Sequence, residues 1–191
     1  MTTLGNGLAD AKHYEDALSV GEAELAMIRR LGADKEDLLV TQSNLATTYS
    51  KIGRFEEALR MDREVYAGFR SLFGNCDRRT LTAANNLVFQ LQKQRKHAEA
   101  VKTLREPLSE ARRAFGDDHD ITLKLSSLLA DSLVGTGTSP TVDDLREAIA
   151  IREDVCRRSR RLLGVSHPYT EIRQRALDGA RSVLARVFPE G

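Results

Sequence analysis

The chain has little of what builds disulfide-stapled, disordered or membrane-spanning proteins. Its 191 residues include two cysteines, four prolines and no tryptophan. A disulfide framework needs more cysteine pairs in a shorter chain, so we expect Cys76 and Cys156 to be unpaired thiols in a reducing compartment. Hydrophobic residues make up 41% and charged residues 30%, which disfavours both extensive disorder and a membrane-spanning class.

An excess of charge of one sign is also missing, because 29 basic residues are matched by 28 acidic ones. Binding to nucleic acid or to an anionic membrane normally requires a basic surface, so neither partner is expected. Residues 1–10 are small and polar, without the basic start and apolar run of a secretory signal. A cytoplasmic location is therefore predicted.

What the sequence does contain is an internal repeat. One marker, a bulky apolar residue followed by glycine, has its glycines 42, 42 and 48 residues apart, at Gly32, Gly74, Gly116 and Gly164. A second marker has its alanines 41, 42 and 48 residues apart, at Ala17, Ala58, Ala100 and Ala148. Turn-forming residues at 135–140 explain the longer last interval as an insertion. A constant period predicts that one supersecondary unit is stacked along the chain.

Each unit is predicted to consist of two antiparallel helices. Apolar residues recur at three- and four-residue steps within each half of a unit, and the strict alternation of a strand is absent. Gly53 and Gly74 can adopt the left-handed conformation that ends a helix, so the two helices of the clearest unit should end there. The small side chains of the alanine marker would allow the paired helices to approach closely.

The order of motifs resembles a known repeat. Asn44-Leu45-Ala46, Tyr49, the run Gly53-Arg54-Phe55-Glu56-Glu57-Ala58 and Leu72-Phe73-Gly74 follow one another within a single unit. This order is similar to the 42-residue variety of tetratricopeptide repeat found in kinesin light chains. The resemblance implies an all-α fold, a right-handed superhelix of antiparallel helix pairs. It also implies that the chain binds a protein or peptide in its concave groove and has neither catalytic activity nor a cofactor.

The expected organisation is one domain over residues 1–191. It divides into a partial repeat (1–37), three repeats (38–79, 80–121 and 122–168, the last carrying the insertion) and a C-terminal capping helix (169–191). The cap should expose Arg173, Arg175 and Arg181. Pro107 removes a backbone donor inside a helix, which predicts a kink or break near Glu106.

Two residues depart from the repeat pattern. Asp62 and Arg152 occupy a position where the family usually has an aromatic residue. This departure argues against tight packing between repeats at both places.

Polar residues on the first helices of two neighbouring repeats form the candidate binding site. Asn44 and Lys51 are seven residues apart, as are Asn86 and Lys93, which places each pair on one helix face. The resemblance implies that these four positions line the peptide groove. The complete candidate set is Asn44, Thr47, Lys51, Asn85, Asn86, Phe89 and Lys93. Carboxamides can pair with peptide bonds and ammonium groups with carboxylates, so an extended, acidic peptide would suit the site. The alternative is an ordinary solvated helix face.

Other polar clusters have simpler interpretations. Residues 117–120 contain metal-ligand types, but consecutive residues do not readily surround one ion, and acids before a helix are ordinary caps. His119 and His167 recur in equivalent turns, and no metal is needed to explain them. Arg157, Arg158, Arg160 and Arg161 are interpreted as the solvated polar face of a helix.

The predicted function is a protein-interaction module of a scaffold. The alternative is a self-associating solenoid without a peptide groove. No motif supports an enzyme.

Overall fold

The computed structural model describes residues 13–135 and 140–188, which form eight helices and no strand. In chain order the helices are α2 (Tyr14–Leu31), α3 (Lys35–Lys51), α4 (Phe55–Phe73), α5 (Arg78–Lys93), α6 (His97–Phe115), α7 (Asp120–Val134), α8 (Val142–Leu163) and α9 (Pro168–Val187). The predicted all-α fold is confirmed. The start of the partial repeat and most of the insertion lie outside the described residues.

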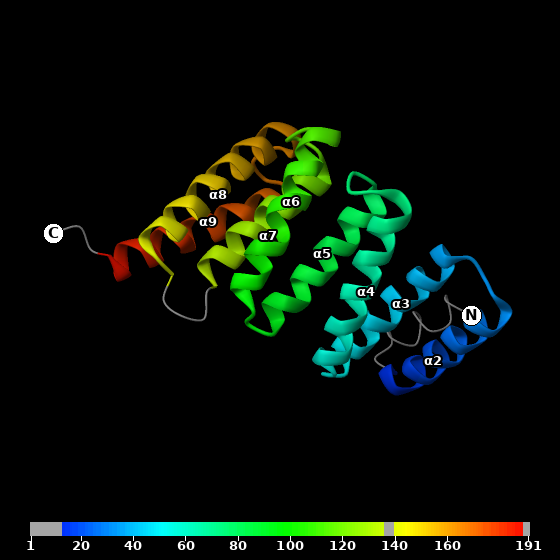
Figure 1. Ribbon diagram of the computed structural model, residues 1–191. Helices are drawn as coiled ribbons and strands as arrows, with labels where there is room; N and C mark the ends of the chain where they lie inside the picture. Colours follow the sequence, from blue (N-terminus) through cyan, green and yellow to red (C-terminus); the bar gives the residue numbers. More distant parts are fainter. Residues whose placement is uncertain (1–12, 136–139, 189–191) are drawn as a thin grey trace. The chain divides into compact units, whose positions relative to one another are not determined.

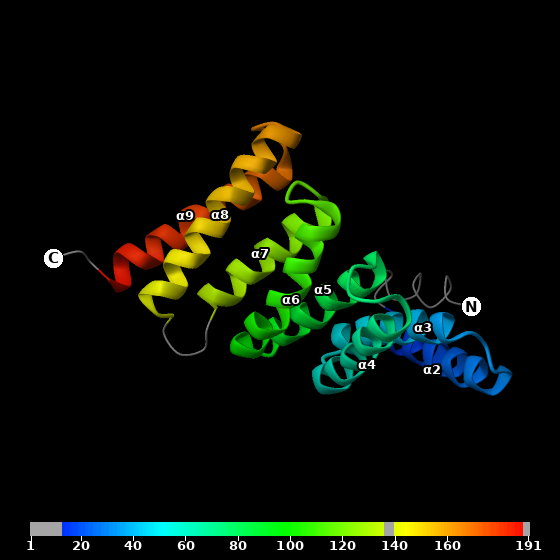
Figure 2. The ribbon, with the colours of Figure 1, turned by 45° about the horizontal axis from the view of Figure 1, so that its top comes forward.

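The chain comprises two compact units, Met1–Gln90 and Leu91–Gly191, and the boundary falls within α5. In the first unit, α2, α3 and α4 pack against one another in chain order (Figure 1). In the second, α6 packs against α7, α7 against α8, and α8 runs beside α9 (Figure 2). The organisation into a single domain remains a prediction.

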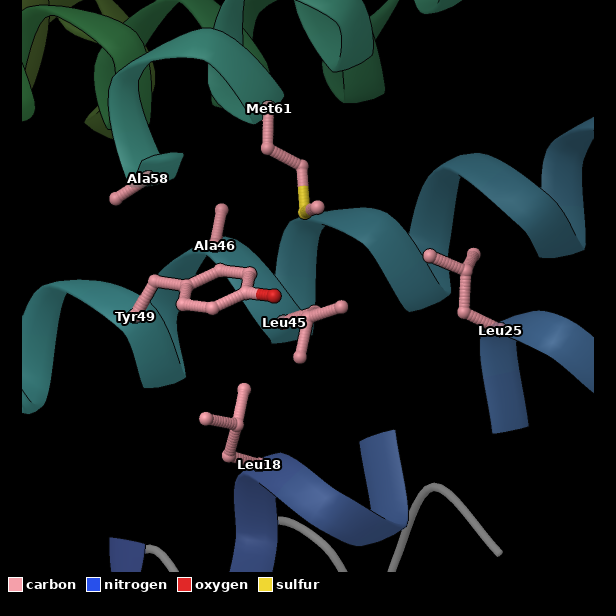
Figure 3. Packing of buried hydrophobic residues seen from close by; sticks show 7 residues of the cluster. All are labelled: Leu18, Leu25, Leu45, Ala46, Tyr49, Ala58 and Met61. Atoms are coloured by element: carbon pink, nitrogen blue, oxygen red, sulfur yellow. The ribbon is translucent and has the colours of Figure 1, made fainter. Parts of the chain in front are cut away.

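The core of the first unit is built from helix faces that meet through small residues. Figure 3 shows Leu18 and Leu25 of α2 facing α3, while Ala46 of α3 lies toward Ala58 of α4. Both alanines are fully buried, as the close approach predicted for the alanine marker requires. A second cluster joins α3, α4 and α5, and it consists of Leu39, Val65, Phe69 and Ala83.

The helix ends follow local sequence signals. Gly53 and Gly74 have φ angles of 84° and 81°, and they follow the last turns of α3 and α4 as predicted. At the other ends, the Nδ1 atoms of His119 and His167 accept the backbone N–H groups of Ile121 and Tyr169. The repeated histidines thus cap α7 and α9.

The break predicted at Pro107 does not occur. Helix α6 continues from His97 to Phe115, and Pro107 is buried within it. The same face of α6 buries Leu104, Leu108 and Ala111. Packing of this face against the unit's core stabilises the helix more than one missing hydrogen bond weakens it.

The packing at Asp62 and Arg152 is not loose. Asp62 is only 4% exposed, and the Arg152 side chain is 12% exposed. The Arg152 guanidinium donates to the Asp131 carboxylate (2.7 Å) and to the Ala176 carbonyl, and so links α8 to α7 and α9. A long side chain fills this position through its own polar partners, which the aromatic pattern does not reveal.

The exposure predicted for the last helix is correct in part. Arg175 and Arg181 are exposed on α9. Arg173 is half-buried and donates to the Ser159 hydroxyl of α8, so its predicted exposure is wrong. Burial lowers the pKa of the Arg173 guanidinium. A role of α9 as a cap stays a prediction.

Candidate functional site

The first unit contains a groove with a volume of about 290 Å³. It is lined by α3 (Val40, Ser43, Asn44), α4 (Phe69) and α5 (Arg78, Arg79, Thr82, Ala83, Asn86). Phe69 and Ala83 belong to the buried cluster that joins these three helices. The groove therefore has an apolar floor set by the core and polar walls supplied by two first helices of neighbouring repeats.

Two arginines lie at one end of the groove. Arg78 and Arg79 line it at the start of α5, and no acidic residue is among the lining residues. Arg79 is held in place, since its guanidinium lies 3.4 Å from the centroid of the Phe73 ring and 2.7 Å from Glu36. Arg79 also donates to Asp77 and lowers the pKa of that carboxyl. These contacts fix the position of a positive charge beside the groove.

Of the seven predicted site residues, Asn44 and Asn86 line this groove together. Asn85 does not line it, although its side-chain amide lies 3.5 Å from the Asn86 carboxamide oxygen. Thr47 is exposed and its hydroxyl donates to the Ser43 carbonyl. Phe89 is 51% exposed. The structure therefore brings two repeat-related carboxamides into one groove.

The two predicted lysines lie elsewhere. The Lys51 ammonium is 5.6 Å from the centroid of the Tyr14 ring, so its side chain extends toward α2. Lys93 is the last residue of α5 and belongs to the second unit. Neither lysine lines the groove.

Several groove residues were absent from the predicted set. Val40 and Thr82 each precede a groove asparagine by four residues and are one repeat period apart. The repeat period could therefore have identified them as equivalent positions on the same helix face as the two asparagines. Phe69 comes from the second helix of its repeat, and its contribution depends on how deeply α4 packs beneath α3 and α5. No sequence signal distinguishes it from an ordinary core residue.

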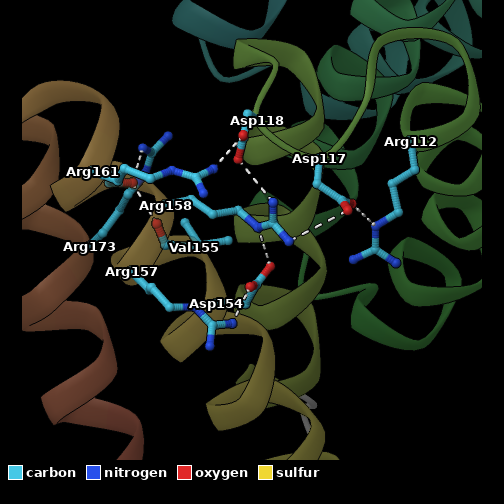
Figure 4. Close-up of polar contacts among 10 residues, drawn as sticks. Arg112, Asp117, Asp118, Asp154, Val155, Arg157, Arg158, Arg161 and Arg173 are labelled. Atoms are coloured by element: carbon cyan, nitrogen blue, oxygen red, sulfur yellow. Dashed lines mark hydrogen bonds and ion pairs between the residues drawn. The ribbon is translucent and has the colours of Figure 1, made fainter.

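Arginines of α8 are paired with acidic residues instead of facing solvent alone. Figure 4 shows Arg158 reaching Asp154 on its own helix and both Asp117 and Asp118 in the turn before α7. The Arg158 side chain is 24% exposed, so its predicted solvation is wrong. Arg161 also pairs with Asp118. The acidic turn that resembled a metal site serves here to bind arginines, and no cluster of metal-ligand residues occurs in the described parts of the chain.

Two family models, both described as tetratricopeptide repeat, match residues 1–71 and 80–120. The chain is a tetratricopeptide-repeat protein. Repeats of this family generally serve as protein-interaction or scaffold modules and are generally not enzymes. No curated protein matches this tetratricopeptide-repeat chain at a significant level. None of its helices within residues 13–135 and 140–188 is long and apolar enough to cross a membrane.

Solved structures share the fold of this tetratricopeptide-repeat protein. Nearly identical TPR-like repeats of a Podosopora anserina protein described as a kinesin light chain superpose with a TM-score of 0.75 at 18% identity, covering 99% of this chain and 95% of that one. A variant of the same repeats gives a TM-score of 0.77 at 17% identity with the same coverage. BtubC (BKLC) from P. vanneervenii gives 0.65 at 18% identity, covering 98% and 80% of the two chains. The predicted solenoid of helix pairs is confirmed at the level of the fold.

Proposed function

We propose that the groove between α3 and α5 binds an extended segment of a partner protein, and that the chain acts as a scaffold or adaptor. The observation that carries the proposal is the convergence of Asn44 and Asn86 on one groove. These residues are 42 positions apart, one repeat period, so the same group is presented twice along the groove. A cytoplasmic location is part of the proposal, because neither Cys76 nor Cys156 forms a disulfide, which suits a reducing compartment.

The two carboxamides suit recognition of a peptide backbone. Each can donate to a peptide carbonyl and accept from a peptide N–H, which does not depend on the side chain of the ligand. The apolar floor formed by Phe69 and Ala83 can accept one apolar side chain of the ligand. Arg78, at the end with the two arginines, can meet a carboxylate, so the ligand we propose is acidic next to its apolar residue.

The expected affinity is modest. A neutral hydrogen bond contributes about 1 kcal/mol net, and a bond to a charged group about 2 kcal/mol. Two carboxamides, one guanidinium and one apolar side chain that contributes about 2 kcal/mol together correspond to a dissociation constant on the order of tens of micromolar. This range suits a reversible scaffold contact.

The proposal is tested with peptides selected from a random library on the full chain. Fluorescence anisotropy then gives the dissociation constant of the best labelled peptide for the wild type and for Asn44→Ala and Asn86→Ala. Each substitution should weaken binding about five- to tenfold, since it removes one carboxamide that hydrogen-bonds the peptide backbone of the ligand.

Asn75→Ala is the matched control, because it makes the same change at an asparagine that does not line the groove. It should change the dissociation constant by less than about twofold. Wild-type affinity in the Asn44→Ala/Asn86→Ala double variant would refute the groove while leaving the fold untouched.

A further inference from the structure

The last helix of the second unit, together with the turn before it, carries a stripe of apolar and small residues. This α9 stripe comprises Val165, Tyr169, Ile172, Ala176, Gly179 and Val183, of which Ala176 and Val183 are half-buried and the others are exposed. Its first three members are 71%, 62% and 54% exposed. The members follow one another at spacings of four and three residues, the spacing of the apolar seam between two helices that pack along their length. Different residues of α9, Thr170, Leu177 and Ala180, are the ones buried where α9 packs beside α8.

Gly179 is a place in this stripe where another helix can approach closely. Two other glycines lie inside helices among the described residues, Gly21 and Gly68, and a leucine side chain lies against each of them. A Cβ atom added at Gly21 would lie 3.0 Å from Leu45, and one added at Gly68 would lie 2.5 Å from Leu39. At Gly179 a Cβ atom would meet nothing within 4 Å. Glycine weakens a helix interior, and no contact within the described chain explains its presence at this position.

A further helix pair of the repeat type would not fit on α9. In α7 the residues Leu123, Ala130 and Leu133 are buried. One period of 48 residues later, the equivalent residues of α9 are Glu171, Asp178 and Arg181, which are all exposed. This face is charged and distinct from the α9 stripe, so the apolar stripe needs a different occupant.

We infer that a second copy of the chain covers the stripe, with two α9 helices packed antiparallel across a two-fold axis. In such an interface, if residue i contacts residue j of the other copy, then j also contacts i. Four members of the stripe meet this condition about a point between residues 177 and 178, because Ile172 faces Val183 and Ala176 faces Gly179. Beyond them, Tyr169 faces Arg186. Large residues then meet at both ends, small residues meet in the centre, and an exposed tyrosine ring meets a guanidinium. The inference concerns the second unit alone and stands apart from the peptide groove.

The oligomeric state is measured by sedimentation velocity over a concentration series of the full chain. Wild type should dimerise reversibly, and Ile172→Glu and Gly179→Leu should each weaken the dimer more than about tenfold. Leu31→Glu is the matched control, because Leu31 is 69% exposed and lies on α2. It makes the same change from an apolar side chain to a charge and should leave dimerisation unchanged. Circular dichroism checks that each variant remains folded.

The register is tested by cross-linking in a Cys76→Ser background. Ile172→Cys chains mixed with Val183→Cys chains should form a disulfide-linked dimer under mild oxidation, and neither variant should do so as efficiently alone. A wild-type monomer throughout the series would overturn the inference and leave the stripe to a different protein. A dimer that Ile172→Glu does not weaken would overturn it as well. The same holds if each cysteine variant alone forms the disulfide-linked dimer as efficiently as the mixture does.

Discussion

Asp62 makes the stability of the chain depend on pH near neutrality. It is 4% exposed within the first unit, and burial raises its pKa from 3.8 to about 7. Desolvation is the cause of the shift, because the charged form of a carboxyl is disfavoured away from water. The folded chain therefore holds a proton at Asp62 that the unfolded chain releases.

The sign and size follow from this difference. Because the folded pKa is raised, the stabilising contribution is complete below about pH 4 and is lost as the pH rises to about 7. A shift of about three pKa units corresponds to about 4 kcal/mol between these limits, since one unit is worth about 1.4 kcal/mol. Ionising the carboxyl at pH 8 should therefore remove a sizeable part of a typical folding free energy of about 5–15 kcal/mol.

The comparison of wild type with Asp62→Asn isolates this contribution. His97 acts in the opposite sense, because burial lowers its pKa and its stabilising contribution is lost as the pH falls. Taking the difference between the two proteins at each pH cancels that effect. Urea unfolding at pH 5 and pH 8 should show that Asp62→Asn gains about 2–4 kcal/mol relative to wild type on going to pH 8.

Two further variants sharpen the test. Asp62→Leu copies the buried Leu104 of the next repeat and should stabilise the chain at pH 8 more than at pH 5. Asp143→Asn, on a side chain that is 95% exposed, should retain the wild-type difference between the two pH values. A gain for Asp62→Asn that is equal at pH 5 and pH 8 would show that Asp62 does not titrate between these values in the folded chain.

Two further predictions concern packing and charge. Gly68→Ala should destabilise the chain by about 1–3 kcal/mol because its Cβ would collide with Leu39, whereas Gly179→Ala should stabilise the monomer by about 1 kcal/mol. Thermal unfolding at low protein concentration measures both, and the same sign for the two would contradict the packing described. Arg158→Ala should lower stability by about 1 kcal/mol in low salt and by less in 1 M salt, because Arg158 binds three aspartates. Urea unfolding at both salt concentrations tests this, and an unchanged difference would argue against an ionic origin.

The helix pairs were predictable because a stacked unit needs the same small residue at each close approach, as at Ala17, Ala58, Ala100 and Ala148. All four are buried in the structure. The convergence of Asn44 and Asn86 on one groove is consistent with the repeat spacing for the same reason.

The failures involve long side chains whose partners lie on other helices. Arg158, Arg173 and Lys51 each reach a group distant in sequence, namely the Asp117–Asp118 turn, Ser159 and Tyr14. Periodicity places such a residue on a face, but the reach of its flexible side chain depends on the neighbouring helix. Pro107 stayed helical because packing of the face around it compensates for one lost hydrogen bond.

The most direct test of the proposed groove follows the side-chain amide signals of asparagine by NMR while a selected acidic peptide is added. We expect the Asn44 and Asn86 carboxamide signals to shift together with peptide concentration, while that of Asn75, which does not line the groove, changes little. Shifts confined to α9, or saturation of binding without any change at Asn44 and Asn86, would contradict the proposed groove.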